Sequence, residues 1–310
     1  MQNIQQLAII GATASGKTSF GVKVAKYIDA HILSLDSLSI YKDIDIVSAK
    51  PTIEERDGVK HFGIDVIYPD ENFDVTLFIK LYHEVYQHCL DDKKNLVIVG
   101  GTGFYLKMLI KGISELPSIS HKTKKIVATH LLDLNKAYRW LCDVDATYMK
   151  NIESKDAYRI EKALNIYIET SLTPTVYFDT YPPIATIKDP LPIYQIVWER
   201  EMLRKRISLR TELMLKDGLI DEVCMLEEKY GRSPNSMKSI GIKETLAYLD
   251  GIYDKNMLIE KITTNTARLA KRQTTFNNSQ FDSVVKGDIE MLEEKLLKGV
   301  SQNTPLINTH

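Results

Sequence analysis

The sequence predicts an α/β protein, with a parallel-sheet core of P-loop type that is flanked by helices and interrupted by a helical insertion domain. Short apolar runs alternate with helical segments in the first third of the chain. A glycine-rich motif follows the first of these runs, at 11–18, and helical patterns dominate from residue 120 onward. Alternation of this kind builds a parallel sheet that helices cover on both faces.

The first third supplies five elements of the core. We expect strands at 6–10, 31–37 and 95–101, because these runs are short and apolar. Helices are expected at 16–29 and 76–92, where apolar residues recur with a helical period. Ligands of parallel sheets bind beyond the carboxyl ends of the strands. The loops that follow these strands should therefore meet at one site.

The middle of the chain has the pattern of a separate helical domain. Helical periods cover 122–141 and 156–170, and a proline-rich stretch then leads to a further strand at 193–198. The chain after residue 200 is mostly helical, and its polar tail at 301–310 should fray. The predicted domains are a P-loop core of residues 1–119 and 187–310, and a helical insertion of residues 120–186.

Composition excludes several classes of protein. The 310 residues have a formal net charge of −1, so any basic surface for nucleic acid must be local. Cys89, Cys142 and Cys224 lie far apart without metal-ligand or redox spacing, which indicates a reduced, cytoplasmic protein. No apolar run approaches the roughly 18 residues that span a bilayer, and the start has no basic signal-peptide region. We expect a monomer with no membrane partner.

The stretch GATASGKT matches the P-loop pattern and lies between a strand and a helix. In such loops the backbone N–H groups hold phosphate oxygens, the lysine reaches the terminal phosphate, and the Ser or Thr hydroxyl holds Mg²⁺. Thr18 is therefore the predicted Mg²⁺ ligand. The predicted phosphate-binding residues are Gly11, Thr13, Ala14, Ser15, Gly16, Lys17 and Thr18.

The third strand lacks the carboxylate that a P-loop ATPase uses to hold Mg²⁺. It ends in Gly100 and Gly101 instead. A Gly-Gly-Thr-Gly turn lets a backbone or a ligand approach closely and leaves the Thr102 hydroxyl available for a hydrogen bond. The alternative is a tight turn from strand to helix with no further role.

Asp36 ends the second strand and should face the same cleft as the P-loop. A lone aspartate beside a phosphate site is a candidate general base or metal ligand. The alternative is a turn or N-cap residue next to Ser37. The polar stretch that follows, at 41–52, is typical of a long functional loop.

Two basic stretches lie in the last third of the chain. One combines basic side chains with an aromatic ring, which suits an RNA backbone and a stacked base. The other, at 204–206, lies one turn before Arg210 and is more typical of a solvated helix face. The residues of the first stretch are Lys261, Arg268, Lys271, Arg272 and Phe276.

Together these motifs resemble one family, the tRNA dimethylallyltransferases, also called tRNA isopentenyltransferases. The resemblance covers most of residues 7–276 and keeps the family's order. A P-loop alone is not specific, but its combination with D-S-x-x-x-Y, A-K-P and G-G-T-G is. The matching stretches are 11–18, 36–52, 100–117, 155–175, 210–223, 239–244 and 268–276.

The resemblance implies an activity. The family transfers a dimethylallyl group from dimethylallyl diphosphate to N6 of the adenosine at position 37, 3′ of the anticodon, in tRNAs that read UNN codons. By this likeness Asp36 is the general base at N6, and Thr102 lies near the reacting centre. Arg210 joins Lys17 in binding the diphosphate, with Mg²⁺ at Thr18. The implied partners are tRNA and dimethylallyl diphosphate.

The same likeness implies contacts with tRNA in both domains. The insertion domain would hold the anticodon stem-loop. The implied tRNA-binding residues are Asp36, Ser37, Leu38, Ser39, Thr102, Lys124, Tyr158, Arg159, Ile160, Glu161, Lys162, Ser239, Ile240, Gly241, Ile242, Lys243, Lys271, Arg272, Gln273 and Phe276.

The chain departs from the family pattern in places. Ala12 stands where proline is usual, Ser39 where glutamine is common, and Ile242 where tyrosine is frequent. Asn277 lies in a stretch without the tryptophan and arginine that often follow K-R-Q. The insertion is also short. We expect these departures to act on tRNA affinity or tRNA choice, because the catalytic set is intact.

Two other activities fit part of the pattern. An adenylate isopentenyltransferase would share the P-loop and Asp36 but act on free AMP or ATP, so it would not need the insertion or the basic C-terminal helices. A P-loop nucleotide kinase, or a binding module without catalysis, would share the loop alone. The missing strand-end aspartate disfavours the kinase. The combination of Asp36, Thr102 and Arg210 exceeds what binding requires.

Overall fold

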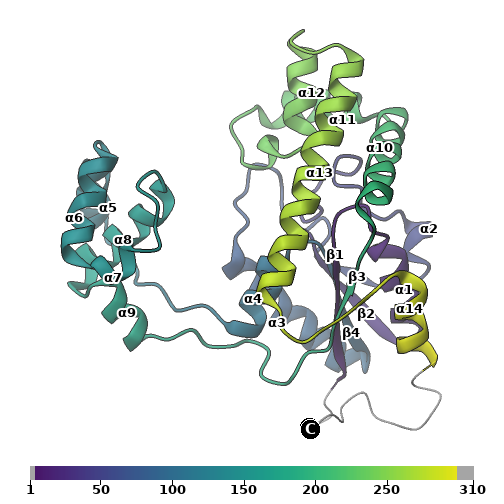
Figure 1. Cartoon of the computed structure of the whole chain (residues 1–310), viewed down its shortest axis with the longest axis horizontal. Coiled ribbons are helices and arrows are strands. Elements are labelled where there is room, and N and C mark those ends of the chain that lie inside the picture. The colour runs from purple at the N-terminus through teal and green to yellow at the C-terminus, as the bar shows by residue number, and fades with distance from the viewer. Residues whose placement is uncertain (1–3, 299–310) are drawn as a thin grey trace. The chain divides into compact units, whose positions relative to one another are not determined.

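The computed structural model describes residues 4–298 and divides into two compact units (Figure 1). The core unit comprises the chain up to Leu109 and from Ile187 onward, and the helical unit comprises Ile110–Thr186. The helical unit thus begins earlier than the predicted residue 120, because the two connecting segments pair through an antiparallel bridge between Ile113 and Ile184. The predicted frayed tail at 301–310 lies outside the described residues.

The core contains a six-stranded, wholly parallel sheet with the order β3-β2-β4-β1-β5-β6. Leu35 pairs with Gly100, and Gly100 pairs with Ile10, so the ends of β2, β4 and β1 lie level at one edge. The loops that carry the predicted site residues therefore start side by side. The strands are β1 (Gln6–Gly11), β2 (Ala30–Leu35), β3 (His61–Phe62), β4 (Asn95–Gly100), β5 (Ile193–Ile196) and β6 (Val284–Gly287).

Two edge strands were not expected from the sequence. β3 has two residues, too few to show an alternating pattern. β6 follows a long helix and has only one buried residue, Gly287, so its sequence lacks the apolar signal of a buried strand. The expectation of a mostly helical C-terminal third is confirmed for the described residues, with the unexpected strand at Val284–Gly287.

Helices cover both faces of the sheet. α1 and the segment that carries Ile289, Leu292 and Leu296 pack on the face that presents Leu7 and Ile9, where they build one hydrophobic cluster. α3 packs on the other face, and its Tyr82 hydroxyl donates to Gln6 Oε1 at 2.7 Å. The core helices are α1 (Lys17–Tyr27), α2 (Ile53–Arg56), α3 (Val75–Asp92), α4 (Gly103–Lys111), α10 (Arg200–Lys216), α11 (Leu219–Tyr230), η1 (Ser236–Lys238), α12 (Ile242–Leu249), α13 (Lys255–Gln280), α14 (Ile289–Glu293) and η2 (Glu294–Lys298).

The helical unit has its own hydrophobic core, which includes Val127, Leu141 and Leu164. The helix predicted at 122–141 is two helices, because the Asp133 carboxylate accepts from Lys136 N–H at 3.0 Å and starts a new helix there. Its helices are α5 (His121–Leu131), α6 (Leu134–Val144), α7 (Ala146–Met149), α8 (Ala157–Thr170) and α9 (Pro174–Thr180). None of the helices within residues 4–298 is long and apolar enough to cross a membrane.

Candidate active site

A cleft of about 830 Å³ opens beyond the carboxyl ends of β1, β2 and β4. The loops after these strands line it together with α10, the segment before α12, and α13. It therefore lies where ligands bind in open parallel sheets. Its lining includes Thr13, Lys17, Thr18, Asp36, Thr102 and Arg210 from the predicted catalytic and phosphate-binding set.

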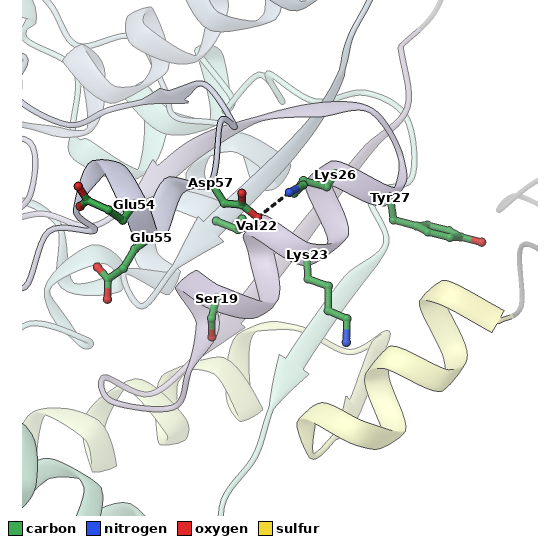
Figure 2. A pocket seen from close by; sticks show the side chains of 8 residues that line it. All are labelled: Ser19, Val22, Lys23, Lys26, Tyr27, Glu54, Glu55 and Asp57. Atoms are coloured by element: carbon green, nitrogen blue, oxygen red, sulfur yellow. Dashed lines mark hydrogen bonds and ion pairs between the residues drawn. The ribbon is translucent and has the colours of Figure 1, made fainter.

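A second hollow lies between α1 and α2 (Figure 2). It is lined by mixed charges, and the Lys26 ammonium pairs with the Asp57 carboxylate at 2.5 Å across it. Lys23, also on its wall, pairs with Glu293. This hollow contains no predicted site residue, so the candidate site is the cleft at the strand ends.

The P-loop has the backbone geometry of a phosphate cradle. Ala14 and Gly16 have φ angles of 63° and 88°, so alternate residues are left-handed and the chain curls into a tight loop. Ser15 between them is buried, and its hydroxyl has no hydrogen-bond partner among the described residues. A Cβ at Gly11 would lie 2.9 Å from Ser15 Oγ, so glycine is needed for the loop to close.

Two cations face this loop in a partly buried site. The Lys17 ammonium donates to Ala12 O at 2.7 Å, and Arg210 Nη1 lies 3.4 Å from Thr13 Oγ1. Burial lowers the pKa of Lys17 to about 8, with the Asp36 carboxylate acting against this shift and Arg210 reinforcing it. Burial also lowers the pKa of Arg210. Asp36 and Glu55 act against the shift of Arg210. Because burial nevertheless lowers the pKa of both cations, the site favours an additional anion.

Asp36 shapes a turn, as the alternative interpretation predicted, and its role as a general base or metal ligand stays a prediction. Its Oδ1 accepts from the backbone N–H groups of Leu38 at 2.8 Å and Ser39 at 3.2 Å, so it shapes the turn after β2. Its Oδ2 has no hydrogen bond to any described residue, and Asp36 lines the cleft. The turn thus fixes one oxygen and leaves the other available to a ligand.

The glycine turn joins β4 to β2 at the edge of the cleft. A Cβ at Gly100 would lie only 2.1 Å from Leu35 O, and Thr102 N–H donates to the same carbonyl at 3.1 Å. The interpretation as a tight turn is therefore also correct. The turn brings Thr102 to the cleft on the strand next to the one that carries Asp36.

Helix α13 closes the cleft with one of its faces. Ile262, Thr266, Leu269, Gln273 and Phe276 recur with a helical period and line it. The Gln273 carboxamide oxygen accepts from Thr13 N–H at 2.9 Å, so α13 is tied directly to the P-loop.

The other predicted residues of α13 have different surroundings. Of the predicted basic pair, Arg272 lines the cleft, whereas Lys271 is exposed and does not line it. Asn277, one of the departures from the family pattern, is wholly buried, and neither its carboxamide nitrogen nor its oxygen has a partner among the described residues. A Cβ at Gly103 would lie 2.3 Å from that oxygen, so the side chain packs against the glycine turn.

The other predicted tRNA contacts are partly exposed and partly buried. Ser239, Ile240, Gly241 and Lys243 line the cleft. Ile242 is wholly buried in the hydrophobic cluster beneath them, so its side chain faces away from solvent. Ser39 is buried as well, with its hydroxyl 3.2 Å from that of Ser34. Ser37 is exposed and Leu38 is half-buried, and both line the cleft.

The helical unit carries its predicted residues on α5 and α8. Lys124, Arg159 and Glu161 are exposed, and Tyr158 is 69% exposed with the Lys162 ammonium 5.5 Å from its ring. Ile160 is wholly buried in the core of this unit, so its side chain is structural.

Sequence reasoning missed the residues that hold the long loop after β2. The Glu222 carboxylate of α11 accepts from the backbone N–H groups of Asp45, Ile46 and Val47 at 2.7–3.0 Å. The Lys50 ammonium, on a side chain 5% exposed, binds Tyr41 O, Asp45 Oδ1 and Asp65 Oδ1, each at 2.6 Å. The A-K-P motif singles out Lys50, but nothing in the sequence singles out Glu222.

The basic run at 204–206 is not simply a solvated face. Arg206 is exposed, but its guanidinium Nε donates to Ala14 O at 2.7 Å. The sequence could not show this contact, because 192 residues separate the two partners.

Comparison with known proteins gives one family. The model of the IPP transferase family matches residues 39–280. A tRNA dimethylallyltransferase of Sulfurovum sp. (strain NBC37-1) is 66% identical over 298 residues, which cover 96% of this chain and 99% of the relative. One of Sulfurimonas denitrificans is 56% identical, with 94% and 98% covered.

Two solved structures are similar over nearly the whole chain. A full-length tRNA isopentenylpyrophosphate transferase from Bacillus halodurans superposes with a TM-score of 0.70 at 28% identity, with 96% of each chain covered. A eukaryotic dimethylallyltransferase acting on tRNA gives a TM-score of 0.82, covering 96% of this chain and 77% of that one. Its identity of 21% makes it evidence for the fold alone.

Proposed function

The chain belongs to the IPP transferase family, and from this premise we propose that it transfers a dimethylallyl group from dimethylallyl diphosphate to N6 of adenosine 37 in tRNAs that read UNN codons. The products are N6-(dimethylallyl)adenosine and diphosphate. One observation supports this most directly: a cationic phosphate loop lines the same cleft as Asp36, whose Oδ2 has no hydrogen bond to any described residue.

The phosphate loop serves the leaving group. As the bond between the allylic carbon and oxygen breaks, its electron pair passes to the diphosphate, and negative charge grows there. Lys17, Arg210 and the loop N–H groups are the donors that stabilise this charge. They are held in place by the fold, so little reorganisation is needed during the reaction.

Asp36 serves the acceptor. The exocyclic amine of adenine is a weak nucleophile, because its lone pair is delocalised into the ring. As the new C–N bond forms at N6, the amine proton passes to Asp36 Oδ2, which makes Asp36 the general base. Thr102, on the neighbouring turn, lines the cleft, and we propose that its hydroxyl contacts the reacting groups.

The oxygen atoms available in the cleft also suit Mg²⁺. This ion prefers oxygen ligands and is usually held by one or two protein groups together with substrate phosphates. Thr18 is exposed on the cleft, and its hydroxyl would hold the ion, as the P-loop pattern predicts. When bound, Mg²⁺ would neutralise charge on the leaving diphosphate.

The acceptor adenosine reaches the cleft only if it leaves its stack. An anticodon loop is single-stranded, so this costs little. We propose that Arg272 and the segment 239–243 contact the loop, and that the exposed residues on α5 and α8 contact the stem. We also propose a cytoplasmic location, since the three cysteines are free, and a monomeric state.

A labelling assay tests the proposal. Purified protein with Mg²⁺ and radiolabelled dimethylallyl diphosphate should label a tRNA that carries A at position 37. The same tRNA with G at that position is the matched control and should remain unlabelled. Label on free AMP but not on tRNA would contradict the proposal and favour an adenylate isopentenyltransferase.

A further inference from the structure

The carbonyl groups of the P-loop need partners of their own. In a phosphate cradle the N–H groups turn toward the ligand, so neighbouring carbonyls turn outward and must be satisfied elsewhere. Ala14 O accepts from Arg206 Nε at 2.7 Å, and Ser15 O accepts from Trp198 Nε1 at 2.9 Å. The carbonyl groups of two consecutive loop residues are therefore bound by two side chains.

These two side chains form one unit. The Arg206 guanidinium lies over the Trp198 ring, 4.6 Å from its centroid, a distance typical of a cation–π contact. The guanidinium also extends along the loop, because Arg206 Nη2 would lie 3.6 Å from a Cβ placed on Gly16. Trp198 follows β5, and Arg206 lies in α10, so both come from elements outside the P-loop motif.

One of the two residues they hold has an unfavourable backbone conformation. Ala14 has a φ of 63°, which costs energy for a residue with a side chain, and such a conformation persists only where its surroundings fix it. Without the bonds to Ala14 O and Ser15 O, the loop would relax and its N–H groups would no longer point at one anion.

We infer that Arg206 and Trp198 are positioning residues that hold the P-loop in its diphosphate-binding conformation. They act on the donor substrate through the loop backbone, not through contact with the reacting atoms. The inference rests on the proposed function only in naming the diphosphate as the donor's binding group. Its test can therefore use inorganic pyrophosphate alone.

Calorimetric titration of the full-length protein with pyrophosphate and Mg²⁺ tests this directly. Trp198→Phe keeps the ring and changes no charge, and we expect about fivefold weaker binding from the loss of one neutral hydrogen bond. Arg206→Met removes a charged donor and should weaken binding about twentyfold. Because both side chains hold the same loop, the double variant should lose less than the product of the two effects.

Arg204→Met is the matched control. It removes one positive charge from the same helix, but Arg204 lies against Glu201, at 3.7 Å, not against the P-loop. Pyrophosphate affinity should stay within about twofold, because an exposed charge contributes little. Equal losses of affinity for Arg204→Met and Arg206→Met would mean that only the positive charge of α10 affects pyrophosphate binding, and would overturn the inference.

Two further readouts separate positioning from loss of folding. In transfer assays, both variants should raise KM for dimethylallyl diphosphate while KM for tRNA stays unchanged. In a Trp140→Phe background, Trp198 is the remaining one of the chain's two tryptophans, so its fluorescence should change when pyrophosphate binds. No fluorescence change and unaltered pyrophosphate affinity in Trp198→Phe would refute the inference. Pyrophosphate binding without any transfer to tRNA would instead refute the proposed function.

Discussion

Two of the loops that line the cleft are held by different contacts. In the phosphate loop, residues 11–18, side chains from elsewhere donate to the carbonyls of Ala14 and Ser15, and the Thr13 N–H donates to Gln273. In the acceptor loop, residues 36–50, the Glu222 carboxylate binds three N–H groups, and Asp36 Oδ2 has no hydrogen bond to any described residue. On the proposed function, the first loop would offer its remaining N–H donors to a diphosphate, and the second would offer an acceptor to an amine proton.

The two loops also differ in how they are anchored. The phosphate loop is short and lies directly between β1 and α1. The acceptor loop is long, and it is fixed by burying Ile40, Ile44 and Val47 in a hydrophobic cluster with α11 and α12. Packing and ion pairs such as those of Lys50 therefore offset the conformational entropy that is lost when this long loop is ordered. Variants that release one loop but not the other can test this difference.

The largest effect should come from Asp36→Asn. Asparagine keeps an oxygen for the N–H groups of Leu38 and Ser39 but cannot take a proton. We expect kcat to fall by about 10²–10⁴, the usual contribution of a general base, with tRNA affinity nearly unchanged. Asp36→Ala should additionally weaken tRNA binding, because it removes the turn. A near-normal kcat for Asp36→Asn would show that the aspartate only shapes the loop.

The junction between β4 and the acceptor loop should be the next most sensitive place. In Gly100→Ala the new Cβ would lie 2.1 Å from the Leu35 carbonyl oxygen. This clash is costly to relieve, because the backbone of β2 would have to move. We expect the free energy of unfolding to fall by about 3 kcal/mol, at the upper end of usual overpacking costs.

Gly101→Ala is the matched control for that change. Its Cβ would meet the end of the Gln273 side chain at 2.5 Å, which moves more easily than backbone, and the Gly11 carbonyl oxygen at 3.5 Å, an ordinary contact. The loss of stability should stay below about 1 kcal/mol. Chemical denaturation of both variants measures the two values, and equal losses would contradict the geometry of the turn.

Glu222→Gln should release the acceptor loop. A glutamine has one acceptor oxygen where the carboxylate has two, and its NH₂ group would face N–H donors. We expect about 2 kcal/mol less stability and a higher KM for tRNA. Glu228→Gln, which neutralises an exposed carboxylate on the same helix, should change neither quantity measurably.

The pH dependence of pyrophosphate binding should report Lys17. Its pKa is lowered to about 8, so the ammonium becomes neutral as pH rises through that value, and affinity is present below it and lost above it. Binding should weaken about fivefold between pH 8 and 9 beyond any change in pyrophosphate itself, as the charged fraction of Lys17 falls from about one half to about one eleventh. Lys17→Arg, which stays charged, should lack this loss. The ratio of the two dissociation constants at each pH measures the effect.

Local motifs predicted the parts of the site that are contiguous in sequence. The P-loop, Asp36 and the glycine turn each follow an apolar strand, so their convergence at one edge follows from the parallel sheet. The turns predicted as the alternatives at Asp36 and at Gly100 are present. The roles of Asp36 and Thr102 in the reaction stay predictions.

The supporting residues could not be predicted in this way. Glu222, Trp198 and Arg206 lie 175 to 192 residues from the backbone groups they bind. A single charged or aromatic residue on a predicted helix or strand end carries no sign of its partner. The edge strands β3 and β6 were missed for a related reason, since pairing with a neighbour and not an apolar pattern defines them.

Steady-state kinetics on two variants tests most directly whether the phosphate loop serves dimethylallyl diphosphate and the acceptor loop serves tRNA. KM for each substrate is measured at a saturating concentration of the other, in Arg206→Met and in Glu222→Gln. The donor and acceptor assignment predicts that Arg206→Met raises only KM for dimethylallyl diphosphate, and that Glu222→Gln raises only KM for tRNA. If the two effects were exchanged, or if each variant raised both KM values equally, the assignment of the two loops would be wrong.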